Sequence, residues 1–174
     1  MKAIILFLLI CISTISFSQS GNNVRNEDLK LEELPEIVLK KIGKDFSVYL
    51  PDRNPDMNVR QLQDYFIAYE LGKDFEGFDN YLVIMKNAKG TLTATYNNKG
   101  KLVRVVEKYQ NVRLPSDVIY SVIKTFPDWG IVDDKYTYTQ NDGDVLKKHY
   151  KIKIKKGKET RKLLVSPNGE IIKS

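Results

Sequence analysis

The stretch Leu114–Trp129 reads LPSDVIYSVIKTFPDW, and a similar stretch, LPEIVLKKIGKDFSVY, stands earlier in the chain at Leu34–Tyr49. In both, apolar residues recur every four positions, which predicts a short amphipathic helix with its proline in the first turn. The matched positions are Leu34/Leu114, Pro35/Pro115, Val38/Val118, Ile42/Val122, Phe46/Phe126 and Tyr49/Trp129. A duplicated module is therefore expected.

Strand-like sequence follows each predicted helix. Gaps rich in Asn and Gly separate the strand segments, which is typical of antiparallel hairpins. The expected strands are Tyr65–Leu71, Tyr81–Met85, Thr91–Tyr96 and Leu102–Tyr109 in the first half, and Lys135–Gln140, His149–Lys155, Arg161–Val165 and Glu170–Lys173 in the second. The offset between the halves is smaller in the strands than in the helices, so we place an insertion at Leu50–Gln61, a loop with two prolines.

These patterns predict an α+β fold: a tandem repeat of a helix plus an antiparallel β-meander, in two modules with the helices on one sheet face. The expected divisions are a signal peptide at 1–18, a flexible lead-in at 19–33, a first repeat at 34–112 with its insertion at 50–61, and a second repeat at 113–174.

The N-terminus is typical of export. Lys2 precedes the apolar run Ala3–Ile12, and small residues, Ser16 and Ser18, stand before Gln19. This pattern predicts a secretory signal peptide that is cleaved near Ser18, and a periplasmic or secreted protein. The run is shorter than a spanning helix requires, and we expect no membrane span in the mature chain.

Charge is concentrated at the C-terminal end. Residues 145–174 hold ten Lys and Arg against two Glu, a net +8. Since the whole chain is +6, removing this end and Lys2 leaves −3 for residues 19–144. The basic end suggests an acidic protein or an anionic envelope polymer as partner, and export argues against nucleic acid.

Strand alternation indicates which sheet face is open. Tyr150, Ile152 and Ile154 should face the helix, so that Lys151, Lys153 and Lys155 face away from it. By the same reasoning Leu82 and Ile84 lie on the side without a helix. These five residues, Leu82, Ile84, Lys151, Lys153 and Lys155, are the candidate partner-binding residues. Two alternatives stay open: Leu82 and Ile84 could pack against the insertion or an N-terminal segment, and the lysines could be an ordinary solvated face.

The motifs of common enzymes are missing from the sequence. His149 is the only histidine, which excludes a paired-histidine site and leaves no zinc ligand set. No phosphate-binding glycine loop is present. Carboxylate pairs such as Asp133/Asp134 fall on expected loops, and an unrecognised hydrolase is the remaining catalytic alternative. We expect no enzyme activity, no cofactor and no metal.

The repeated L-P-x-x-V-x-x-x-[IV]-x-x-x-F segment, with a Tyr-rich strand, a hairpin and the closing Pro167-Asn168-Gly169 strand, resembles the PepSY-like proteins, exported proteins common in Bacteroidetes that are grouped with β-lactamase-inhibitor-like folds. The resemblance spans Leu34–Ser174. It implies helix-plus-sheet modules and an inhibitory or regulatory protein-binding role, with no catalytic residue. We therefore expect a non-catalytic binding module of the cell envelope. The alternative is sequestration of a small ligand, glycan or lipid head group on the open sheet face.

Overall fold

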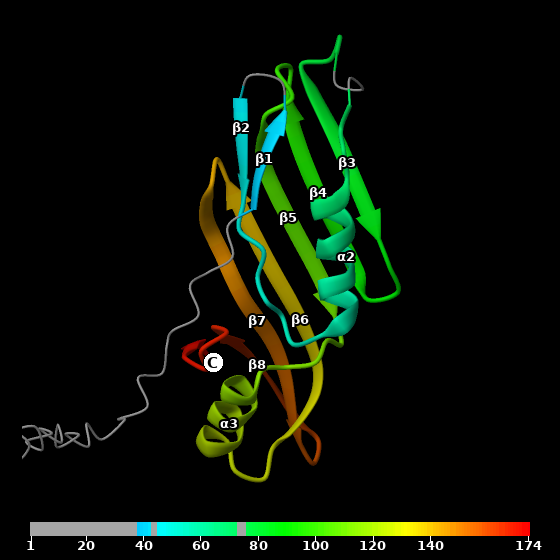
Figure 1. Cartoon of the computed structure of the whole chain (residues 1–174). Helices are drawn as coiled ribbons and strands as arrows, with labels where there is room; N and C mark the ends of the chain where they lie inside the picture. Colours follow the sequence, from blue (N-terminus) through cyan, green and yellow to red (C-terminus); the bar gives the residue numbers. More distant parts are fainter. Residues whose placement is uncertain (1–37, 43–44, 73–75) are drawn as a thin grey trace, which may run out of the picture. The chain divides into compact units, whose positions relative to one another are not determined.

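The structure is a computed structural model that describes residues 38–42, 45–72 and 76–174 (Figure 1). The chain runs through nine strands and two helices in these residues. In order they are β1 Val38–Ile42, β2 Asp45–Tyr49, α2 Met57–Ala68, β3 Asn80–Lys86, β4 Gly90–Asn97, β5 Leu102–Gln110, α3 Ser116–Thr125, β6 Gly130–Asn141, β7 Asp144–Lys156, β8 Glu159–Val165 and β9 Ile171–Lys173.

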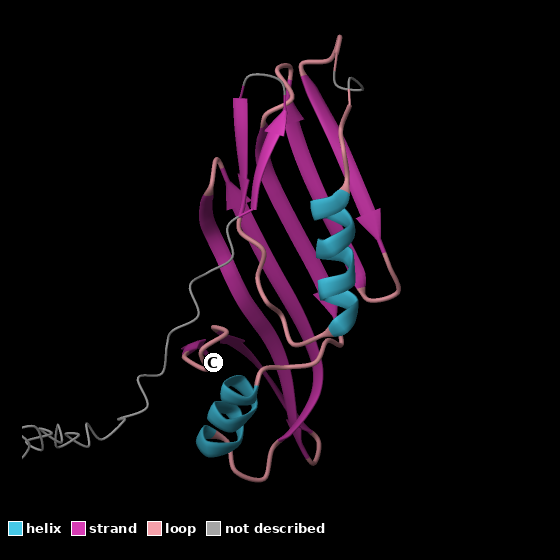
Figure 2. Ribbon diagram, in the orientation of Figure 1, coloured by secondary structure: helices cyan, strands magenta, loops and turns pink. Residues whose placement is uncertain are grey.

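Strands β3 to β9 form one seven-stranded sheet in which every strand pairs antiparallel with the next one along the chain (Figure 2). Tight turns make this order possible. At the β6–β7 turn Asp142 and Gly143 both have positive φ, 46° and 90°, which is the backbone form that joins two strands without splaying them. The predicted meander strands from Tyr81 onwards are confirmed.

The predicted tandem repeat of helix plus meander is wrong. The sheet is continuous across the predicted division at 112/113, because β5 pairs with β6 along seven residue pairs from Arg104↔Asn141 to Gln110↔Lys135. The two halves therefore share one sheet and one core. The helix predicted in the second copy is confirmed as α3.

The first copy does not form the predicted helix. Its described residues form the hairpin β1–β2, a separate two-stranded sheet with Val38 opposite Tyr49. The physical reason lies in the sequence: Gly43 is unfavourable in the middle of a helix, and Ser47-Val48-Tyr49 alternates with a period of two. Ser47 and Tyr49 are both fully buried, whereas Val48 between them is not.

The helix of this half lies instead within and beyond the predicted insertion, at α2. Asp56 caps its first turn by accepting a hydrogen bond from the Asn58 N–H, 2.8 Å from N to Oδ1. Val59, Leu62 and Phe66 form its buried stripe. The prediction of a loop at Leu50–Gln61 is therefore wrong from Met57 onwards. The prediction of a strand at Tyr65–Leu71 is wrong up to Ala68, where the helix ends. Both prolines of the segment, Pro51 and Pro55, precede the helix and do not interrupt it.

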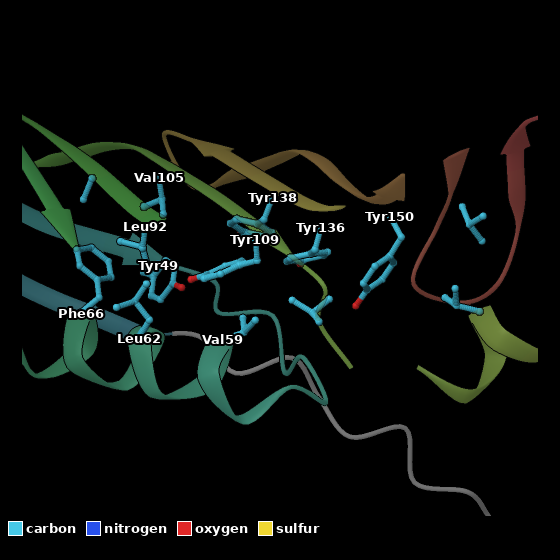
Figure 3. Close-up of a cluster of buried hydrophobic side chains, with 14 of the residues drawn as sticks. Tyr49, Val59, Leu62, Phe66, Leu92, Val105, Tyr109, Tyr136, Tyr138 and Tyr150 are labelled. Atoms are coloured by element: carbon cyan, nitrogen blue, oxygen red, sulfur yellow. The ribbon is translucent and has the colours of Figure 1, made fainter. Parts of the chain in front are cut away.

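The core lies between the sheet and the layer that carries α2, α3 and β2 (Figure 3). Large aromatic residues fill much of it. Six tyrosines are at most 2% exposed: Tyr49, Tyr96, Tyr109, Tyr136, Tyr138 and Tyr150. They alternate with outward-facing residues along their strands, so that Tyr136 and Tyr138 serve core packing. Tyr65, another residue expected on a strand, is 60% exposed on α2.

No helix in the described part of the chain is long and apolar enough to cross a membrane. The expected signal peptide and lead-in, 1–33, lie outside the described residues.

Candidate binding face of the sheet

The predicted alternation in β7 is present. Tyr150, Ile152 and Ile154 are fully buried, while Lys151 and Lys155 are exposed and Lys153 is half-buried on the opposite face. None of these three lysines forms an ion pair with a carboxylate in the described residues. Their charges are therefore presented to solvent or to a partner.

Cross-strand pairing brings further cations to this side of the sheet. Lys151 lies opposite Lys135 of β6 and Leu164 of β8, and Lys153 lies opposite Asp133 and Lys162. We define the basic face as the outward-facing lysines of strands β5 to β9: Lys108, Lys135, Lys147, Lys151, Lys153, Lys155, Lys162 and Lys173. Asp133 adds a carboxylate to this face, opposite Lys153.

The sequence did not indicate the contributions of Lys108, Lys135 and Lys162. They come from three different strands, and only the pairing register places them beside β7. The outward position of each within its own strand pattern was readable from the sequence. Their mutual proximity was not, because register depends on where each turn closes.

A depression of about 340 Å³ lies on the basic face, where β7, β8 and β9 meet. The titratable side chains that line it are all basic: His149, Lys151, Lys162 and Lys173. Burial lowers the pKa of His149 from its ordinary value, and the neighbouring Lys147 and Lys151 lower it further. The imidazole is therefore neutral near pH 7 and offers one donor and one acceptor between the ammonium groups.

Leu82 and Ile84 are exposed, 53% and 51%, so neither the segment Leu50–Gln61 nor any other described residue covers them. They belong to β3, the edge strand of the sheet, and β4, β5 and β6 separate them from β7. Four strand spacings amount to about 19 Å. The structure therefore does not bring the predicted apolar pair and the predicted lysines together; they form two separate features of one face.

A buried carboxylate lies on the other side of the sheet. Glu107 of β5 is 0% exposed and accepts three hydrogen bonds: from Tyr49 Oη at 2.8 Å, Gln63 Nε2 at 3.0 Å and Tyr109 Oη at 3.1 Å. Burial raises its pKa to about 7, although the three donors act to lower the value. Glu107 was not among the residues predicted from the sequence. A Glu at the inward position of the alternating segment Val105–Tyr109 was the available indication.

Asp52 forms a second polar cluster in the segment between β2 and α2. Its carboxylate accepts from Tyr136 Oη at 2.5 Å and pairs with Lys148 Nζ at 2.5 Å. Pro51, Asp52, Gln63 and Asp64 line a depression of about 250 Å³ beside it. The described residues contain no group of three or more His, Cys, Asp or Glu side chains arranged to hold a metal. Both clusters tie chain segments to the sheet.

Comparison with known proteins gives a limited likeness. No family model matches the chain, and no curated protein matches it either. A solved structure of a DUF2874 family protein from Bacteroides ovatus ATCC 8483 is similar, with 16% sequence identity over 70% of this chain and 86% of that chain, and a TM-score of 0.35.

Proposed function

We propose that this chain is a non-catalytic binding module of the cell envelope, exported after cleavage near Ser18, and that its basic face docks an acidic surface of an envelope protein. The observation that carries the proposal is the convergence of lysines from five neighbouring strands on a sheet face that neither described helix covers. Complementary charge of this kind speeds association and selects partners.

The other parts of the proposal rest on the sequence. The non-catalytic assignment follows from the single histidine and the missing catalytic motifs. An inhibitory or regulatory role follows from the PepSY-like resemblance. Of the two motif copies behind that resemblance, only Leu114–Phe126 contains a helix among the described residues. The family assignment therefore depends on the second copy and the closing strands.

A pull-down from envelope extract tests the docking face. Reversing Lys151, Lys153 and Lys155 to Glu should abolish retention of an acidic protein partner, and retention by the wild type should fall with salt because the interaction is screened. The matched control reverses three cations off this face, Arg60, Lys99 and Lys124, and changes the net charge equally. Retention of the same partner by both triple variants would contradict the proposal.

A second candidate is capture of a small anionic ligand, such as a phosphate-bearing lipid head group or glycan. The depression lined by His149, Lys151, Lys162 and Lys173 favours it, because these side chains supply convergent donors for one anion. The double variant Lys162→Gln/Lys173→Gln leaves Lys153 and Lys155 in place. Loss of binding to phosphatidylglycerol vesicles or to inorganic phosphate in this variant, with the protein partner retained, would favour the small ligand. Vesicle binding without phosphate binding would identify the lipid surface as the source.

A further inference from the structure

Strand β3 leaves one edge of the sheet open in the described residues, since it pairs with β4 alone. Its seven residues, NYLVIMK, pair with β4 without a register shift and contain neither Pro nor Gly. Leu82 and Ile84 are half exposed on one face of it. Natural proteins usually protect a sheet edge with charges, bulges, prolines or very short strands. None of these devices occurs between Asn80 and Met85.

The opposite edge of the same sheet shows the contrast. There β9 has only three residues, and the part of β8 that extends beyond it carries Glu159, Arg161 and Lys162. That edge is protected by shortness and charge. The unprotected edge at β3 is therefore a specific feature of this side of the sheet.

Other exposed apolar side chains gather beside β3. Phe78 is 58% exposed and its ring contacts Tyr81, with 6.4 Å between ring centroids. On α2, the Asn58 carbonyl accepts from Asn87 Nδ2 in the β3–β4 turn, so this flank of the helix faces β3. Tyr65, 60% exposed, stands seven residues after Asn58 and lies on the same flank. Apolar surface is thus available on both faces of the sheet at this edge.

We propose that β3 is the seam of a symmetric dimer, in which β3 of a second copy pairs antiparallel with it about a two-fold axis through Val83. The proposal is independent of the proposed function. Aligning the whole strand with itself places Leu82 opposite Ile84 of the second copy, and Tyr81 opposite Met85 of the second copy. Lys86 then lies opposite Asn80, so no like charges meet.

This self-complementarity favours a second copy over a foreign strand, because one patch supplies both sides of the interface. The unpaired N–H and C=O groups of β3 find partners, and the exposed Leu82 and Ile84 become cross-strand neighbours. The axis is perpendicular to the sheet, so the basic faces of the two copies lie on the same side. The lysines of β7 are four strands from the seam, which keeps their mutual repulsion small.

The first test is the molar mass in solution, measured by sedimentation equilibrium on the mature protein purified from cells. A concentration series from about 1 to 100 µM brackets the affinity of a small interface. The wild type should approach twice the mass of one copy. Ile84→Lys replaces the apolar cross-strand contact with Leu82 of the second copy by a charge and should weaken dimerisation at least tenfold.

The matched control is Ile172→Lys at the protected edge, where the isoleucine is 54% exposed. This variant should dimerise like the wild type. A wild type that stays a single copy throughout the series would overturn the proposal, and so would equal weakening by both variants.

The second test fixes the register by oxidative crosslinking. In the proposed pairing the double variant Leu82→Cys/Ile84→Cys places each new thiol opposite one from the second copy, whereas either single variant faces an apolar side chain. The double variant should crosslink at least tenfold more than either single variant. Equal crosslinking by the single variants would overturn the two-fold pairing about Val83.

Discussion

The phenol of Tyr49 donates a hydrogen bond to Glu107 with 2.8 Å between Tyr49 Oη and Glu107 Oε1, and it joins β2 to the centre of the sheet. Gln63 of α2 donates to the other oxygen of the same carboxylate. One buried acid therefore fixes both the hairpin and the helix to β5. Because the group is ionisable, this attachment makes stability depend on pH.

The free energy of unfolding should fall as pH rises from about 4.5 to about 7. Burial raises the pKa of Glu107 to about 7 from 4.5, so within this window the folded chain holds a proton that the unfolded chain has released. The protonated acid contributes its full stabilisation below pH 4.5. This contribution is lost as pH rises to about 7, a change of about 3 kcal/mol in the free energy of unfolding. Urea denaturation between pH 4 and pH 8 measures it.

The variant Glu107→Gln isolates this effect, because the amide cannot titrate in that window. Its free energy of unfolding should stay nearly constant where that of the wild type declines. The difference between the two should therefore change by about 3 kcal/mol from pH 4.5 to pH 7. Parallel curves would show that Glu107 does not titrate in this way.

Removal of one donor should weaken the same attachment. In Tyr49→Phe, Glu107 keeps Gln63 and Tyr109 but loses its shortest hydrogen bond, so we expect a loss of about 1–2 kcal/mol of stability. Tyr120→Phe is the control, since Tyr120 is 67% exposed on α3 and should cost almost nothing. Thermal unfolding of both variants provides the measurement, and equal losses would contradict a special role for the Tyr49 phenol.

The sequence allowed some of this fold to be predicted and not the rest. Asn- and Gly-rich turns and two-residue alternation identified β3 to β9, because both effects are local. A helix was wrongly predicted at Leu34–Tyr49 because its apolar residues fit a helical period. In the described part of this segment, β1 pairs with β2, and Tyr49 is buried against Glu107. The exposed lysines of β7 followed from alternation. Their lysine neighbours did not, since register is a tertiary property.

The Asp52 cluster should contribute more to the free energy of unfolding than a surface ion pair does. Asp52→Asn keeps an acceptor for Tyr136 but loses the close pairing with Lys148, in which the Asp52 side chain is only 11% exposed. We expect a loss of about 1–2 kcal/mol. Asp142→Asn is the control: its 3.7 Å pair with Lys101 is largely exposed, and such pairs contribute little. Similar denaturant midpoints for the two variants would contradict this ranking.

The position of α3 on the sheet should depend on Gly169. Its φ is +88°, and an added Cβ would lie 2.6 Å from the Asp117 carbonyl oxygen in the first turn of α3. Gly157 has a similar backbone, with φ +58°, and an added Cβ there meets nothing within 4 Å. Gly157→Ala therefore reports the backbone strain alone, about 1 kcal/mol, whereas Gly169→Ala adds the cost of moving α3. We expect the second variant to lose at least about 1 kcal/mol more in urea denaturation. Equal losses would mean that α3 can shift freely, and that Val118 and Val122 do not hold it firmly against the core.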